Sequence, residues 1–447
     1  MINRQQLLGD LQSVLRSLES DLLDRTDSSE VPEVGEWLRE EYQRAKDAER
    51  TTHTQKQWMD DFITQVAAAW VLSCVFARFL EDNELVDPPR IAGPGKRLDG
   101  ARDEYTLFFQ DAERAKLTNR EYLLDIFEGL AKLPAGKDVF GPHNPMNAMP
   151  NWLGPDAAGE LLRFFQKIDS DSGELVHDFT DPEWDTRFLG DLYQDLSEAA
   201  RKKYALLQTP EFVEEFILDR TLDPALDEFG LNTESDPDGR FRIINPACGS
   251  GHFLLGAFPR ILNRWQKQEP GTNVRELVQR TLNSIHGVDI NPFAIAIARF
   301  RLLLVAVQAS DVRRLVDAPA FHMNLACGDS LYHGRQRQQT LGDWTDESHY
   351  FRTEDARISA AFCKKELFIA WWPIRHTSRL KIRRRTTPIA NCIRKLVTDS
   401  IRYLYRLWSE SSGSPCVEQV TTGTRRTRRN LESAKLDSLA RSPATAS

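Results

Sequence analysis

The stretch FRIINPACGSGHFLLGAF, residues 241–258, reads as an apolar strand, a glycine turn and the first turns of a helix. Gly249 and Gly251 let the backbone turn tightly and approach a ligand. The helix that follows would present free backbone N–H groups to an anionic group. Leu254 occupies the third glycine position of a G-x-G-x-x-G fingerprint, which disfavours an NAD-dependent dehydrogenase.

Two further strand-and-turn units follow. SIHGVDINPFAIAIARFRLLLVA, residues 284–306, predicts a strand over 285–289 and then a helix, and FHMNLACGDSL, residues 321–331, predicts a third strand. Strands that alternate with helices at this spacing predict a parallel, doubly wound sheet, in which ligands bind beyond the carboxyl ends of the strands. Asp289 would there accept the two hydroxyls of a ribose, and Asp329 would accept from an amino group such as N6 of adenine. We therefore expect a pocket for an adenine nucleoside that carries a carboxylate or a phosphate.

Residues 1–200 are predicted to be mostly helical, because apolar residues recur at helical spacing near their start: Leu7, Leu8, Leu11, Val14, Leu15, Leu18 and Leu22. The most apolar stretch, residues 66–80, is too short to cross a bilayer and contains Arg78, so we expect a buried helix and no membrane association. Residues 86–102 are rich in proline and glycine and are predicted to form a loop. A helix should begin after Thr209 as N-cap, with Pro210 at its first position.

The composition is that of an ordinary globular protein, with 41% hydrophobic and 28% charged residues. The six cysteines form no C-x-x-C pair, which argues against a disulfide framework and favours the cytoplasm. The net charge of −8 is unevenly spread, because residues 371–447 carry 16 Lys and Arg but only 5 Asp and Glu. His252 and His286 have no further ligand at a useful spacing, so we expect no metal site.

The motifs NPACGSGHFL (245–254), VDINPFA (288–294) and GDSL (328–331) resemble those of N6-adenine DNA methyltransferases that use S-adenosylmethionine. YALLQTPEFVEEFI (204–217) resembles the motif that these enzymes carry before their first strand. The longer context, residues 178–220, is similar to the PglX-type family of phage growth limitation and BREX type 2 defence systems. The resemblance extends over residues 1 to about 355.

The resemblance implies an α/β fold in which an N-terminal helical region, 1–200, precedes a partial Rossmann-like, S-adenosylmethionine-binding methyltransferase domain, 201–355. It also implies a role for each motif residue. Thr209 and Pro210 would pack beside the methionine end of the cofactor; Ala247, Gly249 and Gly251 would line its amino-acid portion; Asp289 would hold the ribose and Asp329 the adenine. Double-stranded DNA and other phage-defence proteins are the partners that the family implies.

One element of the family is missing. The reaction needs the adenine to be flipped out and held. The enzymes of the family hold it with Asn-Pro-Pro-Tyr, or the same motif with Phe, after a fourth strand, and the sequence contains no Asn-Pro-Pro. At the expected place stands IAWWPIRHTSRLK, residues 369–381. If its codons are regrouped by one base, Trp371 to Pro373 must encode Val-Ala, and the codons that follow permit Asn-Pro-Pro-Tyr.

We therefore infer that the reading frame changes between Asp355 and Ala370. Residues 356–447 would then be an out-of-frame, disordered basic tail, and the chain would lack catalytic residues and activity as written. The alternative is a non-catalytic helical scaffold with a vestigial nucleotide pocket.

Overall fold

The structure is a computed structural model that describes residues 3–47, 51–134, 136–141, 144–184, 186, 188–190, 196, 209–232, 241–328 and 370–371. These residues lie within one compact unit, residues 1–376. Asp329, the start of the motif at 204–217 and nearly all of the predicted tail lie outside the described residues.

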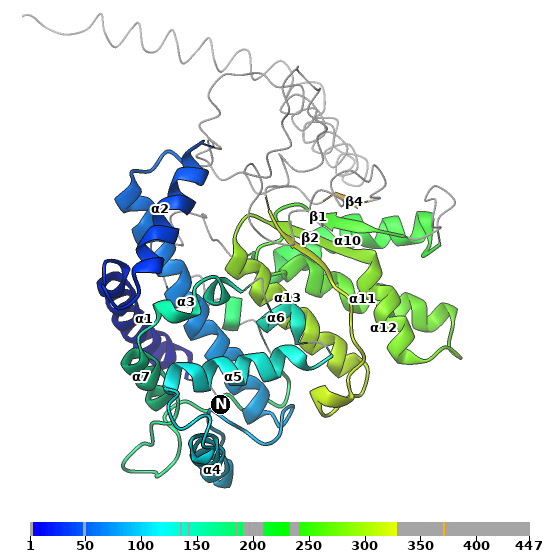
Figure 1. Cartoon of the computed structure of the whole chain (residues 1–447). Coiled ribbons are helices and arrows are strands. Elements are labelled where there is room, and N and C mark those ends of the chain that lie inside the picture. The colour runs from blue at the N-terminus through cyan, green and yellow to red at the C-terminus, as the bar shows by residue number, and fades with distance from the viewer. Residues whose placement is uncertain are drawn as a thin grey trace, which may run out of the picture. The chain divides into compact units, whose positions relative to one another are not determined.

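The first part of the chain is helical, as predicted (Figure 1). Its elements are α1 (Arg4–Thr26), α2 (Pro32–Asp47), α3 (Gln55–Asp82), α4 (Lys96–Gln110), α5 (Asn119–Lys132), α6 (Lys137–Phe140), the 3-10 turns η1 (Pro145–Asn147) and η2 (Pro150–Trp152), and α7 (Pro155–Phe165). The prediction of a loop over 86–102 is wrong for its last part, because α4 starts at Lys96, directly after Gly95 at φ +57°. All the prolines of the segment precede the helix, whereas Gly100 lies within it.

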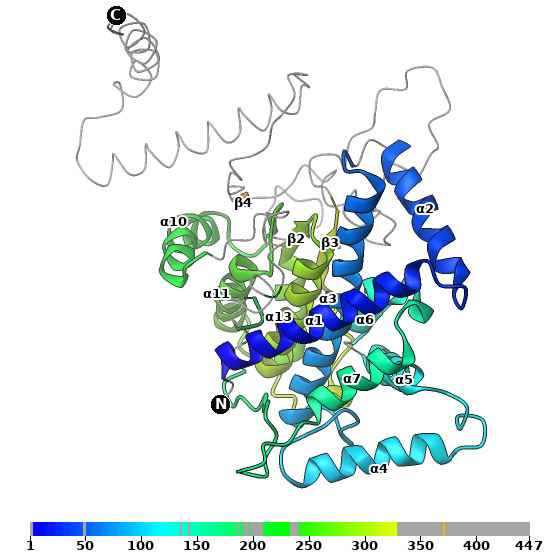
Figure 2. The ribbon, with the colours of Figure 1, turned by 90° about the vertical axis from the view of Figure 1, so that its left-hand side faces the viewer.

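The helices of this region are held by their apolar faces. Along α1 the leucines at helical spacing are buried: Leu7, Leu11, Leu15, Leu18 and Leu22. Figure 2 shows α1 running across α3, which it contacts. By length and composition α3 and α13 (Pro292–Ala309) are apolar enough to cross a membrane, but 89% and 72% of their most apolar windows are buried inside the protein. The prediction that residues 66–80 form a buried helix is confirmed.

A small parallel sheet follows, with strand order β3-β2-β1-β4. Its strands are β1 (Ile243–Asn245), β2 (Ile285–Asp289), β3 (Asn324–Cys327) and β4 (Ala370–Trp371). The first three lie where the sequence predicts them, to within one or a few residues. Helices α11 (His252–Gln268) and α12 (Val274–Ser284) connect β1 to β2, and α13 and the 3-10 turn η3 (Leu315–Asp317) connect β2 to β3. The described chain is thus mostly helical and contains a small parallel sheet.

Helix α10 (Glu211–Phe229) precedes the sheet and contacts α11. Its N-cap is Pro210 rather than Thr209, so the helix begins one residue later than predicted. Glu211 and Glu214 lie in its first turn, where carboxylates stabilise the positive end of the helix dipole.

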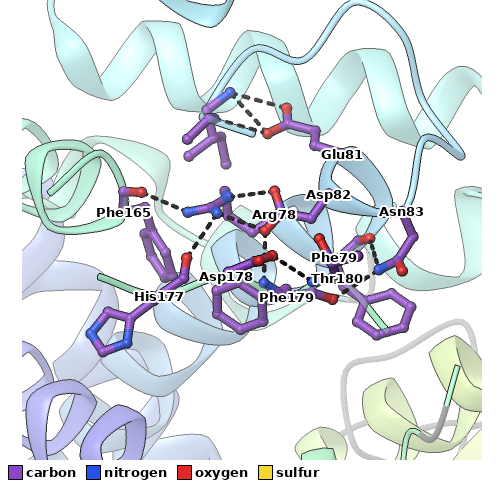
Figure 3. A network of polar contacts seen from close by, with 12 residues as sticks. Arg78, Phe79, Glu81, Asp82, Asn83, Phe165, His177, Asp178, Phe179 and Thr180 are labelled. Carbon is purple, nitrogen blue, oxygen red and sulfur yellow. Dashed lines mark hydrogen bonds and ion pairs between the residues drawn. The ribbon is translucent and has the colours of Figure 1, made fainter. Parts of the chain in front are cut away.

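The C-terminal end of α3 carries a network of buried charges (Figure 3). Arg78 is fully buried and pairs with Asp82, with 2.7 Å between Nη2 and Oδ2. Its guanidinium also donates to the carbonyl oxygens of Phe165, at 2.6 Å, and His177, at 3.0 Å. The Asp82 carboxylate accepts from the N–H of Phe179 at 2.8 Å. A buried charge is tolerated only when it is paired and hydrogen-bonded, so this network fixes the segment after α7 against α3.

Glu81, next to this network, holds the turn that follows α3. Its two carboxylate oxygens accept from the backbone N–H groups of Arg90, at 2.7 Å, Ile91, at 3.0 and 3.1 Å, and Ala92, at 3.1 Å. Burial raises the pKa of Glu81 to about 7, although these N–H groups oppose the shift. The side chain therefore accepts hydrogen bonds from three consecutive backbone N–H groups, which have no partner in a helix or sheet.

We expect Glu81→Gln to lower the free energy of unfolding by about 1–3 kcal/mol, because the amide nitrogen is a donor and leaves buried N–H groups without an acceptor. Chemical denaturation measures the change. Glu128→Gln is the matched control, since Glu128 is 67% exposed and pairs only with Lys132; its effect should stay below about 0.5 kcal/mol. Equal effects of the two substitutions would contradict the role assigned to Glu81.

Candidate functional site

The glycine turn lies between β1 and α11 and has the backbone geometry that its glycines permit. Gly249 has φ +54° and Gly251, the N-cap of α11, has φ +84°. The N–H of Cys248 donates to the carbonyl of Val288 at 3.0 Å, which ties the turn to the end of β2. A Cβ atom on Gly249 would meet no atom within 4 Å, whereas one on Gly251 would lie 3.1 Å from Cβ of Ala298. The turn is thus open on one side and closed by α13 on the other.

Asp289 ends β2 and faces this turn. Its Oδ2 accepts from the N–H of Gly249 and its Oδ1 from the N–H of Asn291, both at 2.9 Å. Burial raises the pKa of Asp289, and the two N–H groups act in the opposite direction. Each carboxylate oxygen can accept more than one hydrogen bond. Asp289 can therefore hold the turn and still accept from a ligand hydroxyl.

The end of β3 lies beside the end of β2. Asp289 pairs with Cys327 in the strand register, and the N–H of Gly328 donates to the carbonyl of Asp289 at 2.9 Å. The structure therefore brings Gly249, Gly251, Asp289 and Gly328 to one edge of the sheet, the carboxyl edge. Asp329, which follows Gly328 in the chain, is outside the described residues, and its role stays a prediction.

The other residues expected at the site are Ala247, Thr209 and Pro210. Ala247 is exposed in the turn, and its N–H donates to Oδ1 of Asn245 at 3.1 Å. Thr209 is half-buried and Pro210 exposed, directly before α10. A Cβ atom on Gly256 would lie 2.2 Å from Oε1 of Glu214, so α10 packs closely on α11. Thr209 and Pro210 thus lie at the start of a helix that packs on α11, and their place beside the methionine end of the cofactor stays a prediction.

Sequence reasoning missed Arg301, which lies in α13 and holds the glycine turn from the side of that helix. Arg301 is 2% exposed, and its Nη1 donates to the carbonyl of Ser250 at 2.9 Å. Its Nε donates to Oγ1 of Thr186, in the segment before α10, at 3.2 Å. The signal was a charged residue within the apolar run of α13, where a buried guanidinium needs acceptors. Arg301 links the turn to the N-terminal helical region.

A second missed residue is Ile290, which follows Asp289 and is 44% exposed at the same edge. An exposed aliphatic side chain next to a carboxylate suits the flat face of a nucleoside base, and the sequence VDI could have signalled it. His286 is buried in β2 and His252 begins α11. No group of three or more His, Cys, Asp or Glu side chains able to hold a metal ion occurs in the part of the chain that the structure describes.

The glycine turn, the carboxylate at the end of β2 and the adjacent end of β3 lie at the carboxyl edge of the parallel sheet, which is where open α/β sheets bind their ligands. Residues 236–359 match the family model described as MmeI, DNA-methyltransferase domain. The part of the chain that carries the sheet is thus similar to a DNA-methyltransferase domain.

A more particular relationship comes from the comparison of sequences over most of this chain. The chain is 47% identical over 373 residues to the adenine-specific methyltransferase PglX of Streptomyces coelicolor, a match that covers 79% of this chain and 30% of that protein. The predicted resemblance to PglX-type methyltransferases is thereby confirmed. A protein of Methanocaldococcus jannaschii named as a type II restriction enzyme and methyltransferase is 27% identical over 225 residues, with 39% of this chain and 18% of the relative covered.

Among solved structures, a chain of the DrdV–DNA complex is similar, with a TM-score of 0.35 and 14% identity over 73% of this chain and 26% of that one. The chain thus spans less than a third of the length of each of these relatives.

We expect Gly251→Ala to destabilise the protein more than Gly249→Ala. Both glycines have positive φ, which costs an L-residue about 1 kcal/mol. Only at Gly251 does the added Cβ also press on Ala298, so its substitution should cost about 2–3 kcal/mol in total. Thermal and urea unfolding of the two variants checks the order. Equal losses, or a larger loss for Gly249→Ala, would contradict the described geometry of the turn.

Proposed function

We propose that the chain is the cofactor-binding part of a DNA methyltransferase that transfers the methyl group of S-adenosylmethionine to N6 of adenine. The observation that carries the proposal is the bond between the Gly249 N–H and the Asp289 carboxylate, at the edge where β2 and β3 end together. The sheet would be the first half of a Rossmann-like fold, and residues 201–355 would form the methyltransferase domain after a helical region, 1–200.

The site residues would divide the cofactor between them. Asp289 would accept the ribose hydroxyls and Asp329 the adenine amine, while Ile290 would cover the adenine ring. Ala247, Gly249 and Gly251 would lie along the amino-acid portion, because a Cβ atom on Gly249 meets open space where that portion would pass. Thr209 and Pro210 would stand beside the methionine end.

The reaction would require the target adenine to leave the double helix, because its N6 cannot reach a methyl donor inside the base stack. The N6 lone pair would form the new N–C bond while the C–S bond of the donor breaks. S-adenosylhomocysteine would be released, and the amine would lose one proton. The amine must donate to acceptors as it attacks. In the family these acceptors are the asparagine side chain and a proline carbonyl of the Asn-Pro-Pro-Tyr motif, which the sequence lacks.

The chain as written would be inactive, and an intact enzyme would be encoded if the reading frame changes between Asp355 and Ala370. Two observations support this. The matched family model ends at residue 359, inside that interval. The match to PglX covers 79% of this chain, and residues 1–355 also make up 79% of its length. The intact enzyme would mark host DNA in the cytoplasm, together with other proteins of a BREX or phage growth limitation system.

We expect the 447-residue chain to bind S-adenosylmethionine weakly, because the sheet of two- to five-residue strands leaves the pocket with few walls. Asp289→Ala should remove the remaining binding, which calorimetry would record as a rise of at least tenfold in the Kd. Gly249→Ala, whose added Cβ would occupy the open side of the turn, should weaken binding as well. Asp99→Ala, 78% exposed on α4, is the control. Tight binding untouched by Asp289→Ala would contradict the assigned site.

We expect the chain as written not to methylate DNA, and a chain in which one nucleotide is corrected upstream of Ala370 to gain N6-methyladenine activity. The arginines near the missing motif, such as Arg375, are donors where acceptors are needed. Sequencing of the locus and mass spectrometry of nucleosides from treated DNA measure the two parts, with the defence-system partners added. Methylation by the uncorrected chain alone would overturn the frame inference.

A further inference from the structure

A cavity lies away from the glycine turn, at the far end of α13. Its volume is about 750 Å³, and it is lined by the ends of α3 and α13, the start of α4 and residues Pro182 and Trp184. Helix α13 starts at the carboxyl edge of the sheet and has 18 residues, so its other end lies about 27 Å from that edge. The N–H of Leu315 donates to the carbonyl of Leu85 at 2.7 Å and holds the segment after α13 against the end of α3. This cavity is therefore separate from the proposed cofactor site.

The backbone around the cavity is strained. Among the described residues, the non-glycine residues with positive φ are Glu84 at +58°, Trp184 at +49° and Asp311 at +51°, and all of them line the cavity. Left-handed backbone costs free energy, most for a bulky residue such as tryptophan, and persists where the surroundings enforce it. Such residues cluster at ligand sites, so their gathering around one cavity points to a binding role.

The charged side chains that line the cavity divide into a paired and an unpaired set. Arg97 pairs with Asp87 at 3.0 Å and donates to the carbonyl of Val86 at 3.0 Å. The unpaired set comprises two guanidinium groups and two carboxylates, none of which joins an ion pair within the part of the chain that the structure describes: Arg313, Arg314, Glu84 and Asp311. The cavity thus offers strong donors and strong acceptors at once.

These groups select one kind of ligand. Adjacent guanidinium groups bind phosphate through charge-assisted, bidentate hydrogen bonds. Carboxylates accept from hydroxyl groups, as sugars provide, and would repel a ligand that is anionic throughout. Trp184, partly packed against the hydrophobic core, also lines the cavity and supplies an aromatic ring against which a base can stack. The volume falls within the range of small-molecule sites, about 300–1,000 Å³.

We propose that this cavity binds a nucleoside phosphate, with Arg313 and Arg314 on the phosphate, Glu84 and Asp311 on the sugar hydroxyls, and Trp184 against the base. The site connects to the rest of the chain through α13, whose Arg301 reaches the glycine turn. A ligand here is a nucleotide other than the methyl donor, because S-adenosylmethionine has no phosphate for the two arginines.

The test is calorimetric titration of the 447-residue chain with ADP, adenosine and inorganic phosphate, in parallel with a short DNA duplex as competitor. We expect ADP to bind with a Kd below about 1 mM and more tightly than adenosine or phosphate. Arg313→Gln combined with Arg314→Gln should weaken ADP binding at least tenfold, and Trp184→Leu should weaken it severalfold. Both arginines are exposed and are expected to be dispensable for folding, which circular dichroism checks.

Two control variants separate this site from the cofactor site. Asp289→Ala should leave ADP binding unchanged, and Arg275→Gln, an exposed arginine on α12, should change nothing. Loss of ADP binding in Asp289→Ala but not in the double arginine variant would place the nucleotide in the glycine turn and overturn the proposal. Absence of ADP binding to the folded chain would overturn it too, as would displacement of ADP by duplex DNA through the same arginines, since the site would then bind a DNA backbone.

Discussion

The burial of two long apolar helices is the constraint on which the rest of the structure depends. α3 and α13 belong to different parts of the sequence, yet they meet at Phe300. The ring of Phe300 stacks on Phe76, with 4.4 Å between centroids, and meets Phe79 edge-on at 5.9 Å. Aromatic contacts of this kind add to the hydrophobic free energy of burial. Neither the helical region nor the small sheet can cover these helices alone, so the two parts share one hydrophobic core.

This shared core has a consequence for the candidate site. Because α13 is buried, the charge of Arg301 must find acceptors inside the protein, and it finds one on each side: Thr186 in the first part and Ser250 in the glycine turn. Asp289 holds the same turn from the sheet side through Gly249. The turn is thus held by the Arg301 guanidinium and the Asp289 carboxylate. Both charges are largely buried, so each needs hydrogen-bond partners inside the protein. Preorganisation of this kind reduces the entropy that a ligand must lose on binding.

The parts of this arrangement that local chemistry dictates could be predicted from sequence. Glycines at Gly249 and Gly251, a carboxylate after a short apolar strand and leucines at helical spacing each have one dominant structural meaning. The contacts of Arg301 could not be predicted, because its acceptors lie 51 and 115 residues away in the chain. The start of α4 at Lys96 was missed for another reason. A run of proline and glycine predicts a loop but does not mark the residue at which the loop ends.

β4 belongs to residues 356–447, the segment proposed to be out of frame, and in the proposed enzyme the residues after a strand at this position would hold the target base. β4 pairs with β1 in parallel register, Ile243 with Ala370 and Ile244 with Trp371, on the side of β1 opposite to β2. Parallel neighbours end at the same edge, so the chain leaves β4 at the edge that carries Gly249 and Asp289. In the proposed enzyme, a base held by the residues that follow would therefore lie beside the methyl donor. The sequence there is Trp-Pro-Ile-Arg-His. Its hydrogen-bond acceptors are the histidine ring and the backbone carbonyls, and it has no side-chain amide. A guanidinium can only donate, and the amine of adenine must donate to be activated. Under the proposed function, the identity of the few residues after such a strand would therefore determine whether methyl transfer to adenine could occur.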